Sequence, residues 1–407
     1  MPVETLQPPS RTASISAARP SIGVLDVWSH IEPRFGGVGP AASALSTAVG
    51  RYGMRIAQVA ICHESEKTLA DGIDSRVSKI RSSAPRGIAD LRIANALRQA
   101  VGAADVCHVH GMWVPHCLAA RRLARELGKP VVSSVHGGLE QWELRHKWLK
   151  KALYSWLLER PSLERSGCLR ALSEREVGDY RRYGSRAAIA LVPNGIEPLE
   201  RVNPSRFLEW FPEVKHKQIV LFLGRIHEKK GILNLVRAWK TVAARRHDAH
   251  LVIAGPSYED AGDKVRELIS DLQLRQAVTL AGVISGPIKT EALSASKYFC
   301  LPSYSEGLSV AVLEALSIGL PPVITPECNF QRVEACGAGR ITSNEPDTLA
   351  DTLVSCLDQG SRPWQDMSRA AQRLARTDFD WNAIGATMGS VYEWLLGGDR
   401  PDCVVVK

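Results

Sequence analysis

The chain repeats one local pattern along most of its length: a short apolar run, a turn with glycine or proline, and then a helical segment. Strands that alternate with helices at this spacing form parallel sheets with helices on both faces. We therefore predict an α/β fold made of two doubly wound, Rossmann-like domains. The apolar runs that we assign to strands are residues 22–27, 55–61, 105–109, 130–136, 168–172, 189–192, 218–223, 250–255, 277–285, 297–303 and 321–326.

A turn-rich stretch, PNGIEP, separates the two series of strands and has Gly195 near its centre. We place the domain boundary there because linkers concentrate proline, glycine and polar residues. Residues 21–195 form the predicted first domain, and residues 196–380 form the predicted second domain. Residues 1–20 are rich in proline, serine and alanine and are predicted to be a disordered tail, and residues 398–407 are predicted to be a second tail.

The composition is that of a globular chain, with 45% hydrophobic and 23% charged residues. No apolar run approaches the ~18 residues that a membrane-spanning helix needs, and the N-terminus lacks the apolar core of a signal peptide. Nine cysteines are scattered without C-x-x-C pairs, which favours reduced thiols and a cytoplasmic location. The net charge of +8 suits a phosphorylated ligand, an anionic membrane or nucleic acid, and does not choose among them.

Two glutamates stand out in the stretch SYSEGLSVAVLEALSIGLPP, residues 303–322, which reads as a polar loop followed by a short helix. With a rise of about 1.5 Å per residue, Glu306 and Glu314 lie roughly 12 Å apart. The paired acids of a retaining glycosidase need a separation of about 5 to 5.5 Å, so that class is excluded. Two separated carboxylates suit an extended ligand such as a nucleotide sugar, whose hexose and ribose hydroxyls they can bind.

The start of the same helix is a predicted anion site. Ser309 is expected to cap the helix, and Gly307 and Leu308 lead into it. A helix N-terminus offers backbone N–H groups and a positive dipole end, so it can face a diphosphate. The plainer interpretation is that Glu306 is a loop charge and Glu314 a solvated helix position.

Basic residues follow the first strand of the second series. Arg225, Lys229 and Lys230 lie between that strand and Gly231, at a turn into a helix. Arginine binds a diphosphate through two parallel hydrogen bonds and lysine binds it as a point charge, so we predict a diphosphate site here. The alternative is a solvated basic loop. Further on, Val283 and Ile284 end a strand at which backbone groups can read the edge of a base.

Glycines and histidines mark the strand ends of the first half. A glycine-rich turn at residues 36–39 includes Gly37, although its spacing matches neither a dinucleotide fingerprint nor a P-loop. His110 and His136 each precede a glycine at the end of a strand, where open α/β sheets bind their ligands.

A metal site is not predicted in this half or elsewhere. A cluster that includes His110 follows no zinc spacing; its members are Cys107, His108, His110, His116 and Cys117. The D-x-D sequence at residues 378–380 precedes a helix, and we interpret Asp380 as its cap.

Residues 141–160 combine tryptophan, leucine and basic side chains at helical spacing. This composition is typical of a helix that lies on an anionic membrane surface. It is equally that of an amphipathic helix that packs on its own sheet, and the sequence leaves both interpretations open.

Taken together, these phrases resemble those of one enzyme family. From about residue 22 to residue 396 the chain resembles a family 4 (group 1) retaining glycosyltransferase, of the bacterial type that builds exopolysaccharides or lipid-linked glycans. The resemblance implies the GT-B architecture, in which two Rossmann-like domains face each other across a cleft. The phrases that carry it are FGGVGPA, HVHGMW, SSVHGG, LVPNGI, LGRIHEKKGI, PSYSEGLSVAVLEALSIGLPP and VITPECNF.

The resemblance also implies roles for residues of the second domain, which would bind the nucleotide sugar. Arg225 and Lys230 would bind the donor diphosphate, and Glu314 would bind the ribose hydroxyls. Glu306 would hold the donor sugar near its reacting carbon.

In the first, acceptor-side domain, the resemblance implies that His136 touches the donor sugar and that Gly37 lies near the phosphates. A last helix, residues 381–397, would return to this domain. Transfer would retain the sugar's configuration and need no metal or other cofactor, because the leaving phosphate would take the acceptor proton.

The implied activity moves a hexose from a nucleotide-diphosphate sugar to a hydroxyl of a glycan or polyprenyl-linked acceptor in polysaccharide biosynthesis. The implied location is the cytoplasm, with peripheral contact at the inner face of the membrane through residues 141–160 as the further option. The alternatives are an epimerase or phosphorylase of the same architecture, an inactive binding protein, and a nucleic-acid binder. The last is supported only by charge, and no nucleic-acid partner is predicted.

Overall fold

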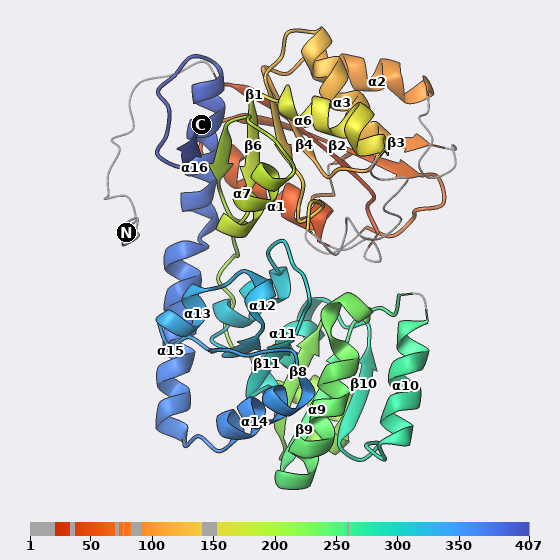
Figure 1. Cartoon of the computed structure of the whole chain (residues 1–407), viewed down its shortest axis with the longest axis vertical. Helices are drawn as coiled ribbons and strands as arrows, with labels where there is room; N and C mark the ends of the chain where they lie inside the picture. The colour runs from red at the N-terminus through yellow and green to blue at the C-terminus, as the bar shows by residue number, and fades with distance from the viewer. Residues whose placement is uncertain are drawn as a thin grey trace.

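The computed structural model describes residues 21–32, 37–69, 73–75, 77–82, 91–140, 153–258 and 260–406 (Figure 1). The predicted disordered tail at residues 1–20 lies outside this range. The described chain forms two α/β domains, each built on its own sheet, as predicted.

The first domain contains a sheet that has eight strands within the described residues, in the order β14-β7-β6-β5-β4-β1-β2-β3. All neighbouring pairs are parallel except β14 with β7. The strands are β1 (Gly23–Ser29), β2 (Arg55–His63), β3 (Ser78–Ser82), β4 (Val106–His110), β5 (Val131–Ser134), β6 (Cys168–Ala171), β7 (Ile189–Leu191) and β14 (Val404–Val405).

The short strand β14 corrects one prediction. We expected residues 398–407 to be a tail, but Val404 pairs with Ala190 and adds an antiparallel edge strand to the sheet. Its side chain is buried with the core of the first domain. Two residues of strand are too short to be recognised by alternation, so the sequence pattern did not reveal them.

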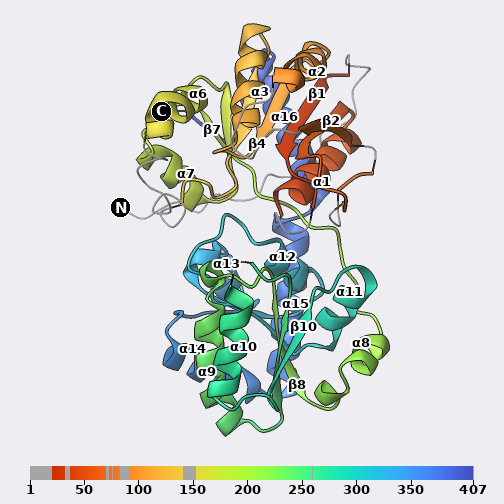
Figure 2. The same ribbon diagram turned by 90° about the vertical axis from the view of Figure 1, so that its right-hand side faces the viewer.

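The helices of the first domain cover both faces of its sheet (Figure 2). The central strands β1 and β4 are buried on both sides, as expected for strands between two helical layers. The helices are α1 (Val38–Arg51), α2 (Leu91–Gly102), α3 (Pro115–Glu126), the π-helical turn η2 (Ser155–Glu159), α6 (Arg160–Glu164) and α7 (Glu174–Arg182).

The second domain has six strands within the described residues, all parallel, in the order β10-β9-β8-β11-β12-β13. The strands are β8 (Gln218–Leu223), β9 (Ala249–Ala254), β10 (Val278–Gly282), β11 (Tyr298–Leu301), β12 (Pro322–Ile324) and β13 (Arg340–Ile341). The helices are α8 (Ser205–Trp210), α9 (Ile232–Arg245), α10 (Ala261–Asp271), α11 (Gly286–Ala295), α12 (Val310–Ser317), α13 (Arg332–Ala335), α14 (Pro346–Leu357) and α15 (Ser361–Asp378).

The last helix, α16 (Trp381–Leu395), leaves the second domain and packs on the first (Figures 1 and 2). Asp380 begins it, and the Asp380 carboxylate accepts a hydrogen bond of 3.1 Å from the backbone N–H of Ala383. This contact confirms the interpretation of Asp380 as a cap. The close approach of α16 to α1 requires Gly385, because a Cβ at that position would lie 2.6 Å from the backbone of Ala48.

Both sheets change direction at an equivalent place. The order reverses between β1 and β4 in the first sheet and between β8 and β11 in the second. In open α/β sheets, ligands bind beyond the carboxyl ends of the strands at this point. The loops that follow β1, β4, β8 and β11 are therefore where a functional site is expected. None of the helices in the described parts of the chain has the length and apolar character of a transmembrane span.

Candidate active site

Glu306 lies in the loop after β11 and is 8% exposed. Its carboxylate accepts hydrogen bonds from Lys230 Nζ at 2.5 Å and from Ser303 Oγ at 2.6 Å. Burial by itself raises the pKa of Glu306, but Lys230, the Ser303 hydrogen bond and the charge of Lys229 together outweigh it, so the pKa is lowered. The carboxylate is thus ionised and ready to accept hydrogen bonds from hydroxyl groups.

The loop that carries Glu306 is anchored by Asn329. The Asn329 side-chain amide donates to the carbonyl of Glu306 and, at 3.0 Å, to the carbonyl of Gly307. Asn329 itself adopts a φ of 64°, a conformation that asparagine tolerates better than most residues. The anchor fixes the backbone from which the Glu306 side chain projects.

Lys230 is placed by a tight turn after β8. The following residue, Gly231, has a φ of 66°, and a Cβ there would lie 1.9 Å from the carbonyl oxygen of Pro302. Only glycine allows the turn to lie directly against the loop that leads to Glu306. The turn at Lys230 and Gly231 thus brings the Lys230 ammonium group, in the loop after β8, to the Glu306 carboxylate in the loop after β11.

The other predicted donor-binding side chains have partners or surroundings of their own. Glu314, on α12, pairs with Lys289 of α11 at 2.8 Å. Arg225 follows β8, and its guanidinium lies over the ring of Tyr258, 5.8 Å from the ring centre. At the end of β10, the Val283 side chain is 64% exposed.

Ile284, by contrast, is buried in the core of the second domain. Its side chain is therefore occupied by packing, and only its backbone remains for the predicted contact with a base.

The start of α12 differs from the prediction in one detail. Ser309 holds the N-cap position, but its side chain makes no capping hydrogen bond, so the predicted side-chain cap is wrong. A helix start without a side-chain cap has backbone N–H groups that can bind an anion. Gly37, at the start of α1 in the first domain, faces this point, because a Cβ on it would lie 3.7 Å from the side chain of Val310.

The two domains touch at the loops that follow β5 and β11. A Cβ on Gly307 would lie 3.1 Å from the backbone nitrogen of Gly137 and 3.2 Å from the carbonyl carbon of His136. The predicted residues His136 and Glu306 are therefore brought to the same place from opposite domains. Neither glycine has room for a side chain at this contact.

Glu140 adds a polar link between the domains. Its carboxylate, on the first domain, lies 3.1 Å from Lys229 Nζ and accepts a hydrogen bond from Ser305, both on the second domain. Glu140 is 4% exposed, and burial raises its pKa to about 7 even though Lys229 opposes the rise. One of the predicted basic residues is thus paired with an acid that the sequence analysis did not identify.

His136 belongs to a polar cluster that extends into the first domain. Its Nε2 lies 3.1 Å from His110 Nδ1, and His110 Nε2 lies 3.0 Å from Asp26 Oδ1. His108 stacks on His110 with ring centres 4.0 Å apart. The nitrogens of His108 bond Tyr392 at 2.6 Å and Ser134 at 2.7 Å.

Part of the same cluster could also be considered as a metal site. One possible ligand atom from each of Asp26, His108 and His110 lies within 4.8 Å of the other two. Every nitrogen of both rings already has a protein partner, so a cation would have to displace hydrogen bonds to bind. Cys117 instead donates to the carbonyl of His110, and Cys107 is packed in the core.

Glu176 holds the turn that contains His136. Ser173 caps α7, and its side chain accepts a hydrogen bond of 3.3 Å from the Glu176 N–H. The Glu176 carboxylate accepts from Gly137 N at 2.7 Å and from Leu172 N at 2.6 Å, rather than from Ser173. The carboxylate therefore fixes the His136–Gly137 turn, at which His136 adopts a φ of 50°.

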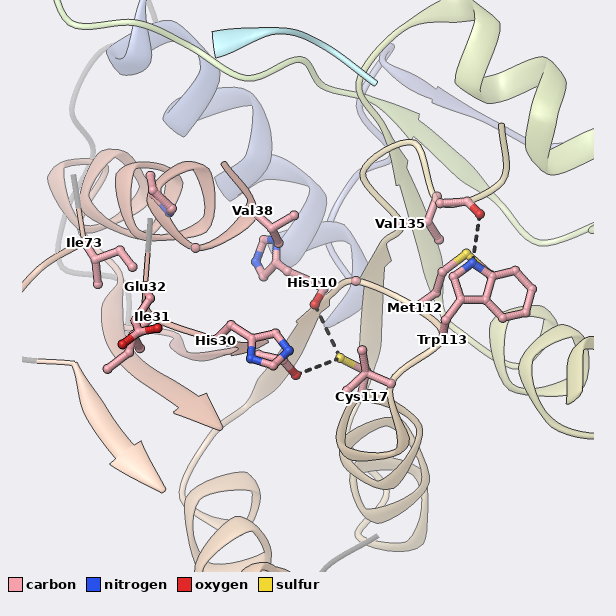
Figure 3. A pocket seen from close by; sticks show the side chains of 16 residues that line it. His30, Ile31, Glu32, Val38, Ile73, His110, Met112, Trp113, Cys117 and Val135 are labelled. Carbon is pink, nitrogen blue, oxygen red and sulfur yellow. Dashed lines mark hydrogen bonds between the residues drawn. The ribbon is translucent and has the colours of Figure 1, made fainter. Parts of the chain in front are cut away.

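A pocket of about 170 Å³ opens beside this cluster in the first domain (Figure 3). We call it the first-domain pocket. It lies at the carboxyl end of the sheet, between the loops after β1 and β4 and the start of α1. Its lining includes His30, Glu32, Pro40, His110, Trp113 and Cys117.

The predicted interfacial helix is described only from residue 153, since residues 141–152 lie outside the described range. In the described part, Leu153, Trp156 and Leu157 are 62%, 69% and 52% exposed. A groove beside them is lined by Trp156 together with Arg160, Arg181 and Arg186. The side chains of Leu153, Trp156 and Leu157 are therefore exposed to solvent.

Four residues of the site were missed by the sequence analysis: Asp26, Glu140, Glu176 and Asn329. Asp26 left a signal, because it is a charged residue in the middle of an apolar strand. The other three lie in loops or at a helix start, where polar residues are ordinary, and only their tertiary partners distinguish them.

Comparison with known proteins agrees with this geometry. Residues 208–374 match the family described as Glycosyl transferases group 1, and residues 36–195 match the Glycosyl transferase 4-like domain. A GDP-mannose:cellobiosyl-diphosphopolyprenol alpha-mannosyltransferase of Xanthomonas oryzae pv. oryzae is 24% identical over 323 residues, which cover 79% of this chain and 82% of that protein. The alpha-D-kanosaminyltransferase of Streptomyces kanamyceticus is 24% identical, covering 74% of this chain and 80% of that protein.

Solved structures share the fold. HepE of Anabaena, in complex with UDP and glucose, has a TM-score of 0.75 at 16% identity, covering 92% of this chain and 100% of that chain. The sucrose-phosphate synthase of Thermosynechococcus elongatus has a TM-score of 0.72 at 19% identity, covering 93% of this chain and 100% of that chain. These likenesses confirm the predicted GT-B architecture.

Proposed function

This chain belongs to the group 1 glycosyltransferases of family 4, and on that premise we propose that it transfers a hexose from a nucleotide-diphosphate sugar to a hydroxyl of a glycan or polyprenyl-linked acceptor. We further propose that the sugar keeps its configuration and that the product serves polysaccharide biosynthesis. The comparisons lend no support to the epimerase or phosphorylase alternative. We propose no nucleic-acid partner.

The observation that carries the proposal is the meeting of Lys230 and Glu306 at the contact between the domains. A donor diphosphate that bound Lys230 and Arg225 would place its sugar beside Glu306 and His136. Glu314 would then accept hydrogen bonds from the ribose. The start of α12, with Gly37 opposite, would surround the diphosphate with backbone N–H groups.

The proposed reaction follows from these positions. The bond between the sugar's anomeric carbon and the diphosphate oxygen breaks, and a bond from the acceptor oxygen forms on the same face. The acceptor proton passes to the leaving phosphate oxygen. Arg225 and Lys230 supply the positive charge that the leaving diphosphate needs, so we propose that the donor is bound without a metal or other cofactor.

The first-domain pocket is our proposed site for the end of the acceptor. His110, the last residue of β4, lines this pocket and contacts His136 directly. An acceptor hydroxyl in this pocket approaches the donor sugar from the first domain, opposite to Lys230. The relative from Xanthomonas is named for a diphosphopolyprenol acceptor, which supports an acceptor of the same class here.

We also propose contact with the inner face of the membrane through the exposed patch formed by Leu153, Trp156 and Leu157. Exposed tryptophan and leucine next to arginine fit the boundary between lipid headgroups and acyl chains. Sedimentation with vesicles of phosphatidylglycerol tests this proposal, with Trp156→Ser as the variant. Equal sedimentation of both proteins, or equal binding to phosphatidylcholine vesicles, would contradict it.

The transfer itself is tested with a panel of UDP- and GDP-sugars. The true donor should raise Tm in proportion to its occupancy of the folded state, and it should be consumed only when a polyprenyl-diphosphate glycan is added. Consumption without any acceptor, with release of an epimerised nucleotide sugar, would favour the epimerase instead. Addition of a chelator should leave the rate unchanged.

A further inference from the structure

A buried series of hydrogen bonds leads from His136 into the first domain and ends at Asp26. His136 Nε2 contacts His110 Nδ1 at 3.1 Å, and His110 Nε2 contacts Asp26 Oδ1 at 3.0 Å. Ser46, on α1, donates to the second carboxylate oxygen of Asp26 at 2.6 Å. Asp26 and His110 are each 1% exposed, whereas His136 keeps part of its surface accessible.

The chemistry of these groups sets the direction of every hydrogen bond. A carboxylate only accepts, so His110 must carry a proton on Nε2 to bond Asp26. In a neutral imidazole the other nitrogen, Nδ1, is then an acceptor. It can be satisfied only by a proton on His136 Nε2, which leaves His136 Nδ1 with a free lone pair.

The surroundings keep both rings neutral. Burial lowers the pKa of His110, although Asp26 opposes the change. Burial also lowers the pKa of His136 well below its ordinary value, helped by His110 and by the buried cation of Arg170. A doubly protonated ring, which would reverse the bond between the two histidines, is therefore not the state at neutral pH.

We propose that Asp26 and His110 are positioning residues that hold His136 in one tautomer, with Nε2 protonated and Nδ1 free to accept a hydrogen bond from a hydroxyl of the donor sugar. The sugar contact rests on the function proposed above, whereas the tautomer does not. This arrangement sets a specificity: the donor must carry a hydroxyl at the position facing His136. A hydrogen there leaves the lone pair unpaired, and a carboxylate there is repelled.

The tautomer can be observed without any substrate. Long-range ¹H–¹⁵N spectra of protein labelled at its histidines report which ring nitrogen is protonated, and the His110→Gln and His136→Gln variants assign the signals. We expect Nε2–H tautomers for both residues in the wild-type protein. A His136 ring protonated on Nδ1, or on both nitrogens, would overturn the proposal, and this arm stands even if no sugar transfer is found.

The Asp26→Asn variant tests whether the Asp26 carboxylate fixes the tautomers of His110 and His136. It keeps the size of the side chain and removes the charge, so we expect mixed tautomers at His110 and His136. Ser133→Ala is the matched control, since it removes a buried hydrogen bond of 2.9 Å to Ser166, in the loop between α6 and β6. Tautomers that stay unchanged in Asp26→Asn, or that change equally in Ser133→Ala, would overturn the proposal.

Kinetic measurements distinguish a role of Asp26 in positioning His136 from a role in stabilising the fold. Once a donor is known, Asp26→Asn should lower kcat about tenfold, the size of one hydrogen bond, with the nucleotide Kd unchanged. The preference for the donor over its deoxy analogue should shrink in the same variant. A preference that stays at the wild-type value would refute the positioning role.

Discussion

Glu140 links the two domains, and its protonation should control how firmly they close. In the closed structure burial raises the pKa of Glu140 to about 7. In an open form the same carboxyl would face water and ionise near its ordinary pKa of about 4.3. Closing therefore takes up a proton at any pH between these two values.

The difference between these two pKa values of Glu140 sets how domain closure depends on pH. The advantage of the closed form is complete below the open-state pKa, falls as pH rises, and is lost by about pH 7. At about 1.4 kcal/mol per pH unit, the full change is about 4 kcal/mol. About 3 kcal/mol of it falls between pH 5 and pH 8, so the ratio of closed to open protein should fall about a hundredfold over that range. The contact with Lys229 persists above pH 7 and limits the opening.

Small-angle X-ray scattering between pH 5 and pH 8 measures this change as a rise in the radius of gyration. Glu140→Gln imitates the protonated acid at every pH, so its radius should stay small and constant. Glu126→Gln, which removes an acid at the surface of α3, is the control and should behave as the wild type. The reasoning is refuted if Glu140→Gln keeps the wild-type pH dependence, or if closure strengthens as pH rises.

Three further changes test the site. Glu306→Gln should lower kcat at least about a hundredfold while calorimetry shows little change in the nucleotide Kd, and an unchanged kcat would contradict its role. Lys230→Ala should weaken nucleotide binding about tenfold, whereas the exposed Lys240→Ala should not; equal binding by both would count against a diphosphate contact. Gly231→Ala should lower Tm more than Gly128→Ala, because both have a similar φ but only Gly231 abuts a backbone carbonyl; equal losses would show that this contact is unimportant.

Several features of the site could be predicted from the sequence because they depend on residues that are adjacent along the chain. The turn at Gly231, the acid at Glu306 and the cap at Asp380 each belong to a short stretch whose local conformation the residue types favour. Ser309 shows the limit of that reasoning. It occupies the predicted cap position, but the sequence could not show that its hydroxyl makes no capping bond.

The sequence by itself determined the alternation of strands and helices, the two-domain architecture, and the acids and basic turns at strand ends, because periodicity and turn chemistry act over a few residues. Only the tertiary structure decided that Glu140 meets Lys229, that Asp26 lies behind His136, and that β14 completes the first sheet. These contacts join residues that are far apart along the chain. Their partners are chosen by how the sheets and domains pack, and no local pattern encodes that choice.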